Sequence, residues 1–247
     1  MNRIKDYDRL SFDIDRWLKD YYYMYAIKAF VVGVSGGIDS AVVSTLCAKT
    51  ELPTYVMTMP LHSKEENTNL SELHAYGLVE KYSNVTLVNV DLTRTYDTLM
   101  TWVDDTFTHN QLANANTKSR LRMVSLYQVA GAVGGIVVGT GNKVEDYGIG
   151  FYTKYGDGGV DIAPIADLYK TEVRELGWHL GVMNEIIDAK PTDGLWDDGR
   201  SDEDQIGATY AELEEAMENG TGKAVDILYK FNKQNRHKMD PIPTFKL

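Results

Sequence analysis

Cysteine and long apolar runs are scarce in this chain of 247 residues. Cys47 is the only cysteine, which excludes an intrachain disulfide framework or a cysteine-based structural zinc cluster and favours a reducing, cytoplasmic setting. The longest apolar stretches, residues 29–34 and 131–138, are far shorter than the roughly 20 residues that span a bilayer. The first residues are too polar for a secretory signal. We therefore expect no membrane partner.

Basic residues are also few relative to acidic ones. The chain has 25 Lys and Arg against 36 Asp and Glu, which gives a formal net charge of −11 at pH 7. Such a surface repels nucleic acid and anionic lipid, so neither is an expected partner. A local group of cations and backbone N–H groups can still bind an anionic small molecule.

Short apolar strands alternate with helical patterns along the chain. The expected strands are residues 30–34, 55–59, 85–90 and 136–139. The expected helices are residues 3–25, 40–50, 65–82, 93–107, 121–133, 168–180, 209–218 and 222–232. This alternation predicts an α/β fold, a doubly wound parallel sheet with helices on both faces, formed by residues 1–247 as a single domain. Ligands of such sheets bind beyond the carboxyl ends of the strands.

Three stretches carry no regular pattern. Residues 148–159 contain five glycines and predict a mobile loop. Residues 193–204 are acidic and expected to be irregular, and a polar tail is expected after residue 232. The single cysteine, Cys47, and the two methionines of the second strand, Met57 and Met59, are expected to pack in the core.

The most informative motif is Gly33-Val-Ser-Gly-Gly-Ile-Asp-Ser40, which lies between an expected strand and an expected helix. Its Gly-Gly pair allows a tight turn whose N–H groups face an anion at the positive end of the helix. Asp39 would repel a phosphate unless it holds Mg²⁺ against it. The turn has no Walker lysine, which suits attack at the α-phosphate of ATP with pyrophosphate leaving. The alternative is a plain strand–helix turn with an N-capping side chain.

The segment Ser35-Gly-Gly-Ile-Asp-Ser40 resembles the signature of the N-type ATP pyrophosphatases, whose fold is adenine nucleotide α-hydrolase-like. Later motifs resemble the family of ammonia-dependent NAD synthetases over about residues 30–240. They are Lys118-Ser-Arg-Leu-Arg-Met123, Gly139-Thr-Gly-Asn-Lys-Val-Glu145, Phe151-Tyr-Thr-Lys-Tyr-Gly-Asp-Gly-Gly-Val-Asp161, Leu168-Tyr-Lys-Thr-Glu-Val173, Lys190-Pro-Thr192 and His237-Lys238. The Thr-Lys-Tyr-Gly-Asp-Gly-Gly run is the most specific of them.

This resemblance implies ATP-dependent amidation of deamido-NAD by ammonia, with Mg²⁺, through an adenylate, releasing AMP and pyrophosphate. The implied ATP-binding residues are Gly33, Val34, Ser35, Gly36, Gly37, Ile38, Asp39, Ser40, Thr140, Lys170 and Thr192. The implied deamido-NAD-binding residues are Arg120, Lys154, Asp161, His237 and Lys238. The implied metal ligands are Asp39 and Glu145, and the side chains expected to take part in catalysis are Asp39, Asp161 and Lys170. The family also implies a homodimer.

Several of these residues have ordinary alternatives. Arg120 could be a solvated charge on its helix, although Arg122 could serve that purpose. Lys154 could be a surface lysine, and His237 and Lys238 could belong to a disordered tail. Either Asp161 or Asp157 could orient ammonium. Gly141 departs from the Asp that many relatives carry and removes a carboxylate near the site, so contacts near Asn142 are in doubt.

The chain has neither the length nor a second cysteine for a glutaminase domain, so we expect free ammonia or ammonia from a separate protein. A tRNA-thiolating enzyme would need catalytic cysteines and a basic face. A GMP synthetase would lack the loop pattern of residues 154–161. A nucleotide-sensing binding protein without turnover is a further alternative, against which the retained Asp39 and Glu145 argue.

Overall fold

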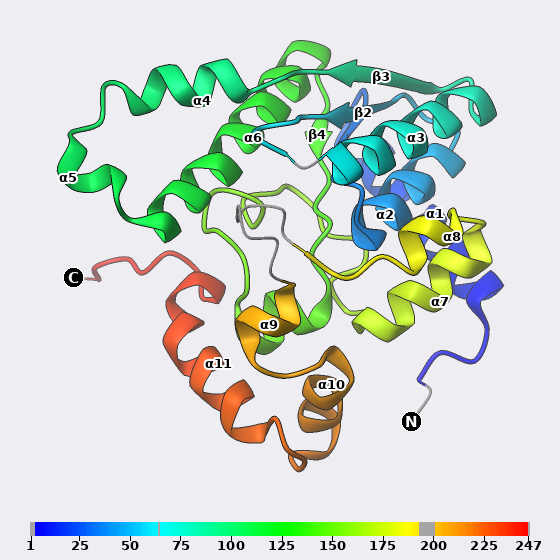
Figure 1. Cartoon of the computed structure of the whole chain (residues 1–247). Coiled ribbons are helices and arrows are strands. Elements are labelled where there is room, and N and C mark those ends of the chain that lie inside the picture. The colour runs from blue at the N-terminus through cyan, green and yellow to red at the C-terminus, as the bar shows by residue number, and fades with distance from the viewer. Residues whose placement is uncertain (1–2, 64, 193–200, 247) are drawn as a thin grey trace.

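The computed structural model describes residues 3–63, 65–192 and 201–246, without the side chains of residues 65–68. Its sheet has the order β3-β2-β1-β4, and all three pairings are parallel. The strands are β1 (Phe30–Gly33), β2 (Thr54–Thr58), β3 (Val85–Asn89) and β4 (Ile136–Val137). The carboxyl ends of β1, β2 and β4 therefore meet at one edge, where the sequence predicts the ligand (Figure 1).

Helices cover both faces of the sheet. One face packs on α1 (Tyr7–Met24), α2 (Ile38–Lys49), α3 (Glu65–Lys81), α7 (Lys170–Leu180) and α8 (Asn184–Ile187). The other packs on α4 (Thr93–Met100) and α6 (Gln111–Val133). Within β1, Phe30 and Val32 face the first group and Val31 faces the second, which is the alternation of a strand buried on both sides. The predicted doubly wound α/β sheet is confirmed.

A third group of helices lies beyond the sheet, at the bottom of Figure 1. It comprises α9 (Asp202–Ile206), α10 (Tyr210–Asn219) and α11 (Val225–Met239). These helices share an apolar core with a π-helix, η1 (Val144–Ile149), through Ile149, Leu213 and Ala224. The C-terminal helices are thereby attached to the segment that follows β4.

Two helix predictions on the α6 side are wrong. The single helix expected over residues 93–107 is broken, because the Asp104 carboxylate accepts a hydrogen bond from Thr106 N (2.9 Å) and starts a new helix, α5 (Asp105–Thr108). The next helix begins at Gln111 rather than at residue 121, with Asn110 as its N-cap. Its first ten residues are mostly polar, so they carry little of the apolar periodicity on which the prediction rested.

The predictions for the C-terminal region also need correction. The last helix runs to Met239, so His237 and Lys238 lie in its final turn and not in a polar tail. Residues 202–206, expected to be irregular, form α9, while residues 193–200 lie outside the described part of the chain. The first residues of the expected glycine-rich loop belong to the π-helix.

Core positions agree with the sequence. Cys47 and Met57 are fully buried, and Met59 is nearly so, as predicted. Burial raises the pKa of the Cys47 thiol far above its ordinary value, so the thiol is not a nucleophile. Among the described residues, we find no helix with the length and apolar character needed to cross a membrane.

A buried histidine joins α3 to the helix that carries the Gly33–Ser40 turn. His74 Nε2 lies 3.0 Å from Ser44 Oγ, and Ser44 Oγ in turn donates to Ser40 O (2.7 Å). Burial lowers the pKa of His74 to about 4, so the folded protein holds this ring neutral.

The free energy of unfolding is therefore expected to fall as the pH falls, because of His74. Between its ordinary value of 6.5 and about 4, the unfolded chain binds a proton at His74 that the folded protein does not. From pH 7 to pH 5 the wild type should lose about 2 kcal/mol of unfolding free energy more than His74→Gln. Urea denaturation of both proteins at the two pH values measures this difference. Parallel pH profiles would contradict the assignment.

Candidate active site

The turn after β1 has the geometry of an anion-binding nest. Gly36 has a φ of 90°, a conformation that glycine adopts without strain, and Gly37 is the N-cap of α2. Ser40 Oγ accepts from Ser35 N (3.1 Å), and Ser35 Oγ accepts from Gly37 N (3.3 Å). Two hydroxyls and successive amides thus gather at the positive end of a 12-residue helix, at the carboxyl end of a central strand.

Three charged side chains from distant parts of the chain meet beside the nest. Lys170, in the first turn of α7, forms a close ion pair with Asp39 Oδ2, and its Nζ lies 3.1 Å from Glu145 Oε1. The exposed fractions of these side chains are 4% for Lys170, 15% for Asp39 and 16% for Glu145. The structure therefore brings together three residues that the sequence assigned to ATP or metal binding.

The electrostatics of this cluster favour a buried cation between carboxylates. Burial opposes the charge of Lys170, but the negative charges of Asp39 and Glu145 outweigh it and raise the Lys170 pKa above its ordinary value. Burial raises the pKa of Asp39, and Lys170 opposes that shift. A cation at the first turn of a helix is disfavoured by the helix dipole, and the carboxylates explain its presence here.

Two further residues hold the carboxylates, and the sequence analysis did not assign them. Asn142 Nδ2 donates to Asp39 Oδ1 (3.3 Å), while its Oδ1 accepts from Val144 N and Glu145 N. Tyr210 donates its hydroxyl proton to Glu145 Oε1 (2.6 Å). Burial, followed by the charge of Glu145, raises the pKa of Tyr210, so the phenol remains a donor. Asn142 lies within a quoted motif, whereas no local pattern marks Tyr210.

The residues expected to bind the dinucleotide gather mostly around residues 150–160. Arg120 Nε donates to Lys154 O (3.2 Å), and Lys154 Nζ donates to His237 O (3.1 Å). Lys238 Nζ donates to Gly150 O and, at 2.8 Å, to Tyr152 O. Four of the five expected residues thus connect α6, the glycine-rich segment and the last turn of α11.

The fifth, Asp161, is held elsewhere. Its Oδ2 accepts from Val137 N (2.8 Å) and its Oδ1 from the Tyr127 hydroxyl (3.0 Å), so it binds β4 to α6. Asp157, the alternative for orienting ammonium, instead bonds Ser119 Oγ (2.6 Å) and Thr153 N (3.1 Å). Desolvation raises the pKa of Asp157, and repulsion from Glu145 adds a smaller contribution to this rise.

The two threonines expected at ATP differ in burial. Thr140 is half-buried directly after Gly139, whose N donates to Ile162 O (2.7 Å). Thr192 is exposed and borders residues 193–200, which lie outside the described residues.

The two arginines of the Lys118–Met123 motif differ in placement. Arg120 is exposed, whereas Arg122 is half-buried and donates from Nε to Met59 O (3.1 Å), just beyond the carboxyl end of β2. Arg122 is therefore not the solvated helix charge that the sequence allowed, and it lies toward the ligand edge of the sheet.

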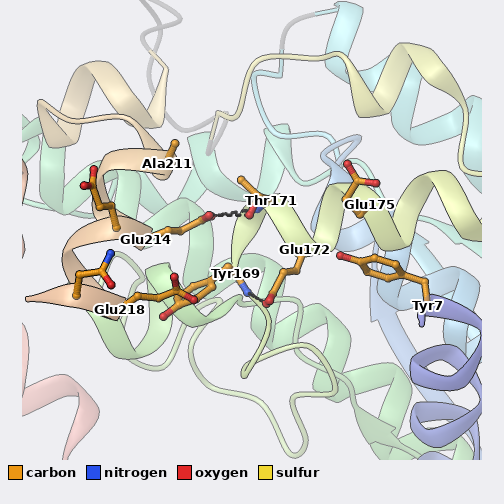
Figure 2. A pocket seen from close by; sticks show the side chains of 10 residues that line it. Tyr7, Tyr169, Thr171, Glu172, Glu175, Ala211, Glu214 and Glu218 are labelled. Carbon is orange, nitrogen blue, oxygen red and sulfur yellow. Dashed lines mark hydrogen bonds between the residues drawn. The ribbon is translucent and has the colours of Figure 1, made fainter. Parts of the chain in front are cut away.

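A cavity of about 540 Å³ lies between α7 and α10 (Figure 2). Its acidic lining consists of Glu172, Glu175, Glu214, Glu215 and Glu218. Figure 2 also shows Glu214 bonded to Thr171 and Glu172 bonded to Tyr169, so part of this charge supports the first turn of α7. A cavity of this charge repels a polyphosphate, so it does not compete with the nest, where the sequence predicts ATP.

The nest, the carboxylates and the glycine-rich segment can now be compared with known proteins. A family model described as NAD synthase matches residues 11–241. The chain belongs to the NAD synthase family.

Known members of the family resemble the chain over nearly its whole length. An NH(3)-dependent NAD(+) synthetase of Finegoldia magna is 38% identical over 237 residues, which cover 94% of each chain. An NMN synthetase structure from Francisella tularensis has a TM-score of 0.89 and 32% identity, covering 99% of this chain and 100% of that one. An NH3-dependent NAD synthetase from Campylobacter jejuni, at 23% identity, shares the fold with a TM-score of 0.79.

Gly141, where many relatives carry Asp, lies against the carboxylate of Asp146. A Cβ at residue 141 would lie 2.3 Å from both carboxylate oxygens of Asp146, so a larger residue there requires the Asp146 side chain to move. Burial, followed by repulsion from Glu145, Asp157 and Asp39, raises the pKa of Asp146 to about 8. Residue 141 itself carries no carboxylate, as the sequence indicates, and the carboxylate of Asp146 lies against it.

A side chain at residue 141 is expected to displace Asp146 and disturb the site. Gly141→Ala should lower kcat/KM about 10- to 100-fold, because moving Asp146 also shifts its chain neighbour Glu145, and small displacements at a site have effects of this size. Combining Gly141→Ala with Asp146→Gly should recover part of the loss by reopening the space. Steady-state kinetics of both variants test this, and full activity of Gly141→Ala alone would contradict the packing argument.

Proposed function

We propose that the chain converts the nicotinate carboxylate of deamido-NAD to the amide, with ATP and ammonia as co-substrates and AMP and pyrophosphate as products. The observation that carries this proposal is the Ser35 nest beside the Asp39–Lys170–Glu145 cluster, in a member of the NAD synthase family. We further propose that residues 1–247 act as one catalytic domain, since Tyr210 near one end bonds Glu145.

In the first half-reaction, a carboxylate oxygen of the substrate attacks the α-phosphorus of ATP, and the bond to pyrophosphate breaks. A carboxylate is already a nucleophile, so no activating base is needed. The amides of Gly36 and Gly37 and the hydroxyls of Ser35 and Ser40 bind the departing phosphates, which carry the negative charge of the transition state. Lys170 supplies a fixed positive charge beside them.

Asp39 and Glu145 are suited to hold Mg²⁺. They are carboxylates next to an anion nest, and Mg²⁺ prefers oxygen ligands shared between carboxylate and phosphate. When bound, Mg²⁺ neutralises the charge that develops on pyrophosphate. Asn142, Lys170 and Tyr210 orient the two carboxylates.

In the second half-reaction, ammonia attacks the acyl carbon of the adenylate. AMP then leaves and keeps the oxygen that came from the substrate carboxylate. Arg120 and Lys154 supply cations for the dinucleotide phosphates, and Lys238 holds the glycine-rich segment through carbonyls on either side of Phe151. We assign the orientation of ammonium to Asp157 or Asp161. Closure of this segment over the site would exclude the water that hydrolyses an adenylate.

The test is the release of AMP and pyrophosphate from a substrate panel. Purified protein is incubated with ATP, Mg²⁺, ammonium and one acceptor: deamido-NAD, nicotinate mononucleotide, xanthylate or none. We expect AMP with a nicotinate nucleotide and none with xanthylate. Formation of ADP, or no AMP with any acceptor, would refute the proposal.

Nicotinate mononucleotide is a second candidate acceptor. The Francisella tularensis protein described as an NMN synthetase aligns over the whole length at 32% identity, and the same amidation of nicotinate mononucleotide would form NMN. The ratio of kcat/KM values for the two nicotinate nucleotides distinguishes the candidates.

We also propose a homodimer in the reducing cytoplasm. The segment of α4, α5 and the start of α6 reaches away from the sheet in Figure 1 and exposes large apolar side chains. Trp102, Phe107 and Leu112 are 84%, 68% and 59% exposed, respectively, and a second copy would cover them. Sedimentation equilibrium is expected to give twice the chain mass of 27.8 kDa, and a monomer at micromolar concentration would contradict this.

A further inference from the structure

Tyr210 is held rigidly at the start of α10. Its side chain is 4% exposed, and its backbone N donates to Glu203 Oε1 (3.0 Å). Thr209 and Glu212 form a capping box around the same helix start. The Lys170 ammonium lies 4.9 Å from the centre of the Tyr210 ring. These contacts hold the ring, and its hydroxyl lies 2.6 Å from Glu145 Oε1 and 3.3 Å from Asp202 Oδ2, so Glu145 is the nearer acceptor.

The bond from this hydroxyl engages one specific oxygen of Glu145. Glu145 Oε1 accepts from Tyr210 OH (2.6 Å) and lies 3.1 Å from Lys170 Nζ. Two donors occupy Oε1, and no described residue donates to Oε2, so Oε2 is the oxygen available to a further ligand. A carboxylate fixed in this way loses little rotational freedom when it binds a cation.

The geometry points to Tyr210 as a positioning residue that holds Glu145 with Oε2 directed at the metal, so that α10 completes the metal site. This inference rests on the proposed function. Partners that orient metal ligands typically contribute 10- to 100-fold to metal affinity. The contribution belongs to the hydroxyl rather than the ring, so Tyr210→Phe removes it and retains the packing.

The experiment measures Mn²⁺ binding by electron paramagnetic resonance, with α,β-methylene-ATP present so that no turnover occurs. Tyr210→Phe is expected to raise the Kd for Mn²⁺ about 10- to 100-fold. The matched control is Thr171→Val, which removes the bond from Thr171 Oγ1 in α7 to Glu214 in α10 (2.6 Å, Figure 2), a bond that involves neither Asp39 nor Glu145. The control should change the Kd less than threefold. An unchanged Kd in Tyr210→Phe, or an equal loss in Thr171→Val, would overturn the proposal.

A second pair of variants tests whether Tyr210 acts through Glu145. In a Glu145→Gln background, adding Tyr210→Phe should weaken Mn²⁺ binding no further, because the oriented oxygen is already altered. Additive losses would overturn the inference. In turnover assays, Tyr210→Phe should need more Mg²⁺ for half-saturation and approach the wild-type kcat at saturation, which a purely structural role would not produce. Because Mn²⁺ binding is read separately from AMP release, failure of this inference leaves the proposed function standing.

Discussion

Asp39→Asn is expected to lower kcat by about 1,000-fold or more while the protein stays folded. The substitution keeps the shape of the side chain and the bond from Asn142, but it removes one of the two charges expected to hold Mg²⁺. A thousandfold loss corresponds to about 4 kcal/mol of transition-state stabilisation, a size that a metal ion supplies.

The measurement is AMP release at saturating Mg²⁺, together with circular dichroism to confirm the fold. Asp167→Asn is the matched control, since the Asp167 side chain is exposed and its carboxylate pairs with Lys143 (2.7 Å). The control should keep its activity within about twofold. Near-normal turnover of Asp39→Asn would contradict the proposal that Asp39 holds Mg²⁺.

Lys170→Met is expected to lower stability and activity together. It leaves Asp39 and Glu145 buried beside each other without their cation, and breaking a buried charge pair costs about 3–5 kcal/mol. Loss of a charge beside the phosphates should also lower kcat by at least about 100-fold. Lys143→Met, which removes a surface ion pair, should cost less than about 1 kcal/mol.

The pH dependence of Lys170→Met has a defined sign. Lys170 lowers the pKa of Asp39 in the wild type, so its loss moves the folded-state pKa further above the unfolded value of 3.8. The folded variant then binds a proton that the unfolded chain releases, and stability falls as pH rises above about 4. Urea denaturation should show that Lys170→Met loses more unfolding free energy, relative to the wild type, at pH 8 than at pH 5. Adding Mg²⁺ with ATP should reduce the loss at pH 8. An equal loss at both pH values would contradict the buried-pair argument.

Much of the fold was accessible from the sequence because its signals are local. The apolar run that forms β1 predicted a strand buried on both faces, and Phe30 and Val31 pack on opposite sides of the sheet. The break at Asp104 was missed because a capping bond interrupts a helix without changing its apolar pattern. The sequence predicts too short a final helix because the last turns carry polar residues, such as His237, that favour a tail as much as a solvated helix.

The candidate site likewise contains residues that local motifs predict and residues that only the folded structure reveals. Asp39, Glu145 and Lys170 were found from motifs, and the fold brings them together. Tyr210 could not be found, because its role depends on α10 packing against η1, a contact between distant segments. Asp146 was missed because its place beside Gly141 depends on a π-helical turn that the residues around it do not indicate.

The most direct test of the account follows the carboxylate oxygen through the reaction. Deamido-NAD labelled with ¹⁸O in the nicotinate carboxylate is incubated with ATP, Mg²⁺, ammonium and the protein, or labelled nicotinate mononucleotide is used if the panel identifies it as the acceptor. Because the carboxylate oxygen attacks the α-phosphorus and later leaves with it, mass spectrometry should find one ¹⁸O in AMP and none in pyrophosphate. Label in inorganic phosphate or pyrophosphate, or unlabelled AMP, would contradict attack at the α-phosphate.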